Sequence, residues 1–89
     1  MDERVVITVT GVDHPGIIAA VTAVLAKYNA NIEDLSQTIL QDLFTMIMIV
    51  NVTGVNLEKM TEELERVGEE QRVKVLVQHE NIFRYMHRI

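Results

Sequence analysis

The segment Asp13-His14-Pro15-Gly16 carries the residue types best suited to binding a small molecule. It separates a β-branched run from an apolar helical run, so we expect a helix to begin there. Proline suits the first turn of a helix, because its missing N–H would have no partner there. Glycine lets another group approach the backbone closely, and the free N–H groups of a helix N-terminus attract an anion such as a carboxylate. Alternatively, Asp13 or His14 only caps the helix, and Gly16 only permits close packing.

Residues suited to catalysis or metal binding are sparse. The chain has no cysteine, which excludes disulfides, thiolate zinc sites, iron–sulfur clusters and cysteine nucleophiles. Ser36 is the only serine, and no histidine stands near it in the sequence. The histidines, at positions 14, 79 and 87, lack the spacing of a metal site, although Asp13 beside His14 leaves weak metal binding open. We therefore expect no catalytic residue, no cofactor and no metal site, and we expect that the protein is not an enzyme.

The composition is that of an ordinary folded domain, with 48% hydrophobic and 24% charged residues. A net charge of −5 argues against nucleic acid and anionic membrane surfaces as partners, because both recruit an excess of lysine and arginine. No apolar run reaches the roughly 18 residues that span a bilayer, and the N-terminus does not resemble a signal peptide. We therefore expect a cytoplasmic protein.

Four segments have the residue pattern of β-strands. Residues 4–10 and 72–78 alternate valine, isoleucine or leucine with other residues and are rich in β-branched side chains. Residues 32–40 are more polar. Residues 43–52 follow them after the dipeptide Gln41-Asp42, which predicts a hairpin.

Two segments have the period of amphipathic helices. Residues 17–28 place one apolar face on Ile17, Ile18, Val21, Val24, Leu25 and Tyr28. Asn56 suits an N-cap, and an apolar stripe follows it to an expected end near Gly68. Residues 80–89 form a short amphipathic segment with Ile82, Phe83, Met86 and Ile89 on one side. Because so short a helix is not stable alone, this segment must dock on another surface to be ordered.

The predicted order of elements is βαββαβ. The sequence Val9-Thr10-Gly11-Val12-Asp13 recurs as Val52-Thr53-Gly54-Val55-Asn56, each time where a strand precedes a helix, which indicates two similar halves. Right-handed crossovers would place both helices on one face of a four-stranded antiparallel sheet. The expected fold is a ferredoxin-like α+β sandwich. We expect a single domain over residues 1–89, with a core of residues 4–79 and a short C-terminal helix within residues 80–89.

The second face of this sheet is also apolar. Residues 43–52 carry apolar side chains on both predicted faces, and Leu43, Ile47 and Ile49 lie opposite the face that the helices cover. Val6 and Leu76 belong to the same second face. Monomeric proteins rarely leave such a patch uncovered. We therefore expect a homodimer or larger oligomer, with the C-terminal segment covering part of the patch in its own chain or in a partner.

Asp13-His14-Pro15-Gly16-Ile17, followed by Val21, Leu25 and Ala30-Asn31-Ile32, closely resembles the first half of ACT domains. These domains are small-molecule-sensing modules attached to many enzymes of amino-acid metabolism. The order of elements matches over residues 4–79, whereas residues 11–32 carry the specific motif. The ending, residues 81–89, is similar to that of an uncharacterised family of free-standing single ACT domains.

The resemblance implies a binding site made of Asp13, His14, Pro15, Gly16, Ile17, Asn31 and Ile32. In amino-acid-binding ACT domains the ligand lies where the first loop meets the start of the second strand, often across a subunit boundary. By this analogy, Asp13 would contact an ammonium or hydroxyl group, and the N–H groups of Gly16 and Ile17 a carboxylate. Asn31 would hydrogen-bond a polar end of the ligand, or would instead only close the turn before the second strand. Serine-sensing ACT domains have His and Asn where this chain has Gly11 and Asp13, which puts serine as the ligand in doubt.

The implied function is a non-catalytic regulatory domain that binds an amino acid and acts on a metabolic enzyme, a transport system or a transcriptional response. The alternative is an interaction module that dimerises and docks a partner, with a vestigial ligand site. Acylphosphatases share the topology but carry a phosphate-binding arginine in the first loop, and residues 11–16 contain none. RNA-recognition domains need exposed aromatic residues on the central strands, where Phe44 alone is available.

Overall fold

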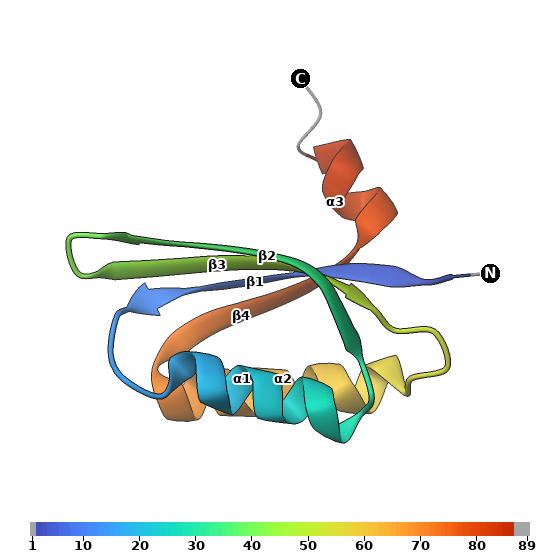
Figure 1. Cartoon of the computed structure of the whole chain (residues 1–89), viewed down its shortest axis with the longest axis horizontal. Coiled ribbons are helices and arrows are strands. Elements are labelled where there is room, and N and C mark those ends of the chain that lie inside the picture. Colours follow the sequence, from blue (N-terminus) through green and yellow to red (C-terminus); the bar gives the residue numbers. More distant parts are fainter. Residues whose placement is uncertain (1, 87–89) are drawn as a thin grey trace.

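The computed structural model describes residues 2–86 and contains seven elements in the order βαββαβα (Figure 1). They are β1 (Arg4–Val12), α1 (Ile17–Lys27), β2 (Asn31–Leu40), β3 (Leu43–Asn51), α2 (Leu57–Gln71), β4 (Val73–His79) and α3 (Glu80–Met86). The predicted elements and the hairpin turn at Gln41-Asp42 are confirmed, with shifts of a few residues at their ends. Among the described residues, no helix has the length and apolar character needed to cross a membrane.

The four strands form one antiparallel sheet in the order β2-β3-β1-β4. Figure 1 shows α1 and α2 side by side on one face, whereas α3 projects from the other side. The expected ferredoxin-like sandwich is confirmed. Because β1 and β3 are the central strands, their side chains supply most of the sheet's contribution to the core.

The core lies between the helices and the central strands. Alternate residues of both strands are buried on the helix face: Val5, Ile7 and Val9 of β1, and Phe44, Met46, Met48 and Val50 of β3. The predicted apolar faces of the two helices pack against these strand residues. They contribute Ile17, Val21 and Leu25 from α1, and Met60 and Leu64 from α2. Burying each such side chain stabilises the fold by about 1.5–3 kcal/mol. The two sequence periods therefore predicted which faces pack together.

The predicted end of the second helix near Gly68 is wrong, because α2 continues to Gln71. Glu69, Glu70 and Gln71 are good helix formers and extend the helix by three residues. Gly68 is buried inside the helix, where an added Cβ would lie 2.9 Å from Val75 Cγ2 and 3.0 Å from the carbonyl oxygen of Val73. This glycine therefore permits close approach of α2 to β4 and does not end the helix.

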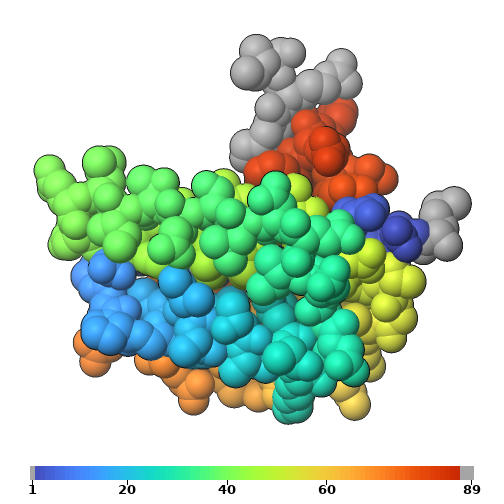
Figure 2. Space-filling view, in the orientation of Figure 1, coloured from blue at the N-terminus to red at the C-terminus, as the bar shows by residue number. Residues whose placement is uncertain are grey.

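The sheet face opposite α1 and α2 is only partly covered. Val6 is buried there and lines a groove with Ile47, Ile49, Glu80, Phe83 and Arg84, so α3 covers this end of the face within its own chain. Leu43 is 54% exposed and Leu76 is 46% exposed, so the rest of the expected apolar patch is open. On α3, Ile82, Tyr85 and Met86 are exposed, and Figure 2 shows the helix standing out from the body of the molecule. The predicted positions His87 and Ile89 lie outside the described residues.

Replacement of Gly68 by alanine is expected to destabilise the protein by about 1–3 kcal/mol, because the new methyl group must displace the Val75 side chain and press on the Val73 carbonyl of β4. In an unobstructed helix the same change would instead stabilise by about 0.5–1 kcal/mol. Urea unfolding measures the difference, with Glu65→Ala on the exposed side of α2 as the control. A Gly68→Ala protein as stable as the wild type would contradict the packing described here.

Candidate functional site

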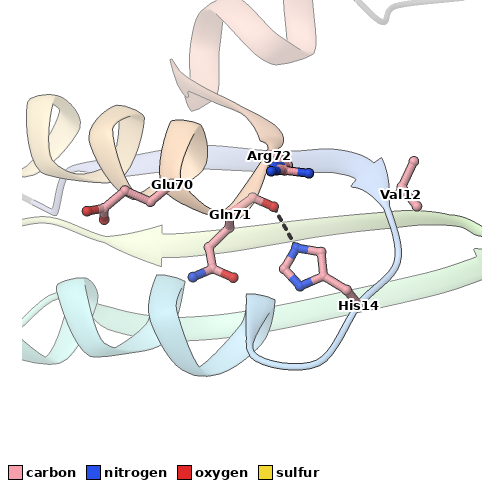
Figure 3. Close-up of a pocket in the computed structure, with 5 residues that line it drawn as sticks. All are labelled: Val12, His14, Glu70, Gln71 and Arg72. Atoms are coloured by element: carbon pink, nitrogen blue, oxygen red, sulfur yellow. Dashed lines mark hydrogen bonds between the residues drawn. The ribbon is translucent and has the colours of Figure 1, made fainter.

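Three turns meet at one end of the molecule, which we call the loop end. It comprises the β1–α1 loop (residues 13–16), the β2–β3 turn (41–42) and the α2–β4 turn at Arg72. The Asp13 N–H donates a hydrogen bond of 2.7 Å to the carbonyl oxygen of Asp42. On the opposite side, the His14 ring contacts the Gln71 carbonyl oxygen (Figure 3). The first loop is therefore held between the hairpin and the end of α2.

Helix α1 begins without a side-chain cap. Its N-cap is Gly16, which has the left-handed angles φ 99° and ψ −9° and accepts the first helical hydrogen bond from Ala20 N–H. In contrast, Asn56 caps α2 by accepting from Lys59 N–H at 3.2 Å. The N–H groups of the first turn of α1 therefore point out of the helix without a capping acceptor. The interpretation that Asp13 or His14 caps this helix is wrong.

The other residues of the predicted loop site have distinct positions. Pro15 precedes the N-cap, so it lies two residues before Ile17, the first helical residue, and not in the first turn where the sequence placed it. The Ile17 side chain is buried in the core, which leaves only its backbone for a ligand. Asp13 is exposed. The loop thus offers one carboxylate beside free backbone donors.

Both ring nitrogens of His14 face carbonyl oxygens. Nδ1 lies 2.9 Å from Pro15 O, and Nε2 lies 2.5 Å from Gln71 O. Because a carbonyl oxygen only accepts, both contacts are hydrogen bonds only when the protonated ring donates from both nitrogens. The Gln71 carbonyl, then the Pro15 carbonyl and the Asp13 charge, raise the pKa of His14, whereas burial and Arg72 oppose this. Gln71 also ends α2, where the helix dipole favours a cation.

An open pocket of about 530 Å³ lies beside this histidine. Its lining is Val12, His14, Glu70, Gln71 and Arg72 (Figure 3). Sequence reasoning identified only His14 among these residues. It missed Glu70, Gln71 and Arg72 because it ended the second helix at Gly68, and the helix-forming run Glu69-Glu70-Gln71 was the signal that would have found this end of the helix.

Asn31 and Ile32 lie at the opposite end of the sheet. Asn31 pairs with Asn51 of β3, whereas Val12, beside the loop, pairs with Leu43. These two positions of β3 are about 26 Å apart along an extended strand. Within one chain, residues 13–17 therefore lie together, but Asn31 lies far from them. The left-handed residue of the preceding turn is Asn29, so Asn31 does not close that turn.

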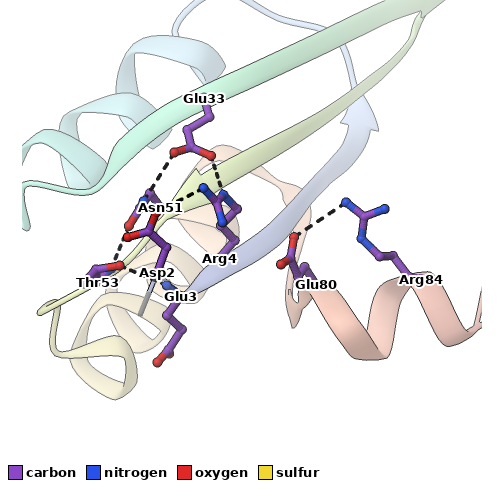
Figure 4. A network of polar contacts seen from close by, with 8 residues as sticks. All are labelled: Asp2, Glu3, Arg4, Glu33, Asn51, Thr53, Glu80 and Arg84. Carbon is purple, nitrogen blue, oxygen red and sulfur yellow. Dashed lines mark hydrogen bonds and ion pairs between the residues drawn. The ribbon is translucent and has the colours of Figure 1, made fainter.

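A polar network holds the start of β2 in place (Figure 4). Glu33 lies at an irregularity in the register of β2, accepts from Arg4 Nε at 2.6 Å and accepts from Asn51 Nδ2 at 3.3 Å. The Arg4 guanidinium is the main cause that lowers the pKa of the Glu33 carboxyl. The network joins β2 to both central strands near its start, where Asn31 is exposed. No group of three or more metal-ligating side chains lies together within residues 2–86.

The fold and the uncapped loop agree with a small regulatory ligand-binding domain, and the comparison with known families shows that class. Residues 3–78 match the sequence profile described as ACT domain, and the chain belongs to the ACT domain family. The UPF0237 protein of Methanococcus maripaludis is 57% identical over 98% of this chain and 99% of its own length. The resemblance to free-standing ACT domains is therefore confirmed.

Solved structures give the same result. An ACT domain protein from Streptococcus pneumoniae has a TM-score of 0.80 and 34% identity, and the match covers 93% of this chain and 96% of that one. The regulatory subunit of aspartate kinase from Thermus thermophilus has a TM-score of 0.69 and 23% identity, and the match covers 85% of this chain and 51% of that one. The second likeness concerns the fold alone.

The double contact of His14 predicts a pH dependence of stability. Because the folded protein holds this proton more tightly than the unfolded chain, the contribution is complete below the ordinary pKa of 6.5. It is lost as the pH rises through the higher folded-state pKa. In urea unfolding between about pH 6 and pH 8, the wild type should therefore lose more stability than His14→Gln. His79→Gln is the control and should behave as the wild type does, whereas equal losses in the wild type and His14→Gln would refute the role of His14.

Proposed function

We propose that this protein is a non-catalytic, cytoplasmic regulatory domain that binds an amino acid at the loop end and acts on a metabolic enzyme or regulator. The observation that carries the proposal is the uncapped start of α1 beside the exposed Asp13 carboxylate. Backbone N–H groups at a helix N-terminus suit a ligand carboxylate, and Asp13 suits an ammonium group. Membership of the ACT domain family supports a regulatory role.

The complete site requires two copies of the chain. Asn31 lies too far from the loop of its own chain, so a second copy must supply it. Strand β2 is an edge strand that pairs with β3 on one side, and its outer edge has no partner strand among residues 2–86. It is exposed at nearly every residue and carries no charge from Leu35 to Leu40. Such an edge is a template for pairing with another strand.

Antiparallel pairing of two β2 edges about a two-fold axis would align opposite ends of the two sheets. Asn31 of one copy would then lie toward the loop end of the other. Leu35 and Ile39 pair with core residues of β3 and so lie on the helix side, where both remain exposed. Their burial would add apolar contact area to the backbone hydrogen bonds of the edge.

The alternative function is a docking module whose ligand site is vestigial. The observation in its favour is the second apolar surface, formed by Leu43, Ile47 and Leu76 of the sheet and the exposed side chains of α3. In that case a partner protein would cover the sheet face, and changes in the loop would leave its binding unaltered.

Asp13→Ala and Asn31→Ala are each expected to abolish amino-acid binding while leaving the free energy of unfolding nearly unchanged. Neither side chain is buried or caps a helix, so the loss would be one of ligand contacts. Screening the twenty amino acids by differential scanning fluorimetry identifies the ligand, and calorimetry then measures its affinity. Asp42→Ala, an exposed acid at the same end, is the control. Binding that survives in both variants would refute this site.

A mixture of Asp13→Ala and Asn31→Ala proteins tests whether the site is shared between copies. Each heterodimer would carry one intact site, so an equal mixture should recover about a quarter of the wild-type sites. The recovered sites are counted by calorimetry after the subunits have exchanged. If the mixture binds no more amino acid than the two variant proteins bind separately, Asp13 and Asn31 do not act across two chains.

The wild-type chain is expected to sediment as a dimer at micromolar concentration, and the double variant Leu35→Lys, Ile39→Lys as a monomer. Two like charges along the paired edges would repel those of the other copy. Leu76→Lys, on the other face of the sheet, is the matched control and should remain dimeric. Dissociation of the Leu76→Lys protein alone would place the interface on the sheet face, and a monomeric wild type would refute the dimer.

A further inference from the structure

Arg72 combines an unusual backbone with an unpaired charge. It follows α2 with φ 58° and ψ 40°, a left-handed conformation in which glycine is the usual residue. No carboxylate forms an ion pair with its guanidinium among residues 2–86. Strained backbone conformations cluster at functional sites, so such a residue is a candidate for a functional side chain. The pocket that Arg72 lines gives this side chain a place to act.

We propose that the pocket between the β1–α1 loop and the α2–β4 turn binds a small monocarboxylate with an apolar chain, and that Arg72 holds its carboxylate. The planar guanidinium offers two parallel N–H groups that match the two oxygens of a carboxylate. The Val12 side chain, 56% exposed at the same pocket, contacts the apolar part of the ligand. The volume of about 530 Å³ lies within the range of small-molecule sites.

The charged side chains that line the pocket favour a ligand with a single negative charge. His14 is held between two carbonyl oxygens, which favour its cationic form, and Arg72 is the second cation. Glu70 is the one carboxylate in the lining. With the His14 ring protonated, the lining carries an excess of one positive charge, which suits a monocarboxylate better than a polyanion such as a nucleotide phosphate.

This pocket differs from the amino-acid site proposed above. Glu70, Gln71 and Arg72 lead into β4, so the pocket lies on the β4 side of the first loop. Strand β2 is the opposite edge of the sheet, and Asn31 of a second copy would approach from there. The two sites share the loop but use different side chains for charge recognition.

The test is a ¹H–¹⁵N NMR titration of the full chain with 4-methylpentanoate and with its neutral amide. Neither probe has an ammonium group for Asp13, so the titration reports on the pocket and not on the amino-acid site. We expect the carboxylate to shift the resonances of Val12, His14 and Arg72 and the amide to leave them in place. Equal binding of the two probes, or shifts confined to residues 16–18, would overturn the proposal.

Arg72→Gly is the decisive variant because glycine suits the left-handed turn, so the fold should be kept or strengthened while the guanidinium is lost. We expect at least a tenfold loss of affinity for 4-methylpentanoate, with a urea midpoint at or above that of the wild type. Arg66→Gln, on the exposed side of α2, is the matched control for charge and should bind normally. Asp13→Ala should also retain binding, which separates this site from the amino-acid site. Unchanged affinity in Arg72→Gly would overturn the proposal.

Discussion

The packing of α1 and α2 on the central strands is the interaction on which the rest of the structure depends. Alternate side chains of β1 and β3 form one apolar face, and both helices must lie on it to bury their own apolar stripes. Each helix then runs antiparallel to the strand before it. As a result, the β1–α1 loop, the hairpin turn and the α2–β4 turn all fall at the same end. The candidate sites are therefore a consequence of core formation.

Backbone geometry sets the properties of the loop end. Of the five residues with positive φ among residues 2–86, Gly16, Gln41 and Arg72 lie in its three turns. The loop is held mainly by hydrogen bonds to carbonyl oxygens, those of Asp42 and Gln71. Such bonds leave the Asp13 and Arg72 side chains free to meet a ligand. Strain gathered at one end of a well-packed domain is a common arrangement at functional sites.

A domain of this length has a thin core, since it buries only about 60–65% of the surface that its unfolded chain exposes. Within residues 2–86, the outer edge of β2 has no partner strand and part of the sheet face is open. Association with a second copy would cover apolar surface and complete a ligand site in one step. A ligand that binds at a site shared by two copies stabilises the dimer. By linkage, dimerisation strengthens ligand binding by the same free energy. That linkage would let such a domain regulate a partner.

The sequence by itself determined the order of elements, the two apolar periods and the loop motif, because propensity, periodicity and capping act over a few residues. Only the tertiary structure decided how far α2 extends, since Gly68 ends a helix or packs against β4 according to what lies opposite it. The repeated pentapeptides also differ, with Gly11 inside β1 and Gly54 in a turn. Tertiary structure likewise placed Asn31 far from Asp13 and brought Arg72 beside His14. These distances depend on strand register and element length, which local sequence patterns do not specify.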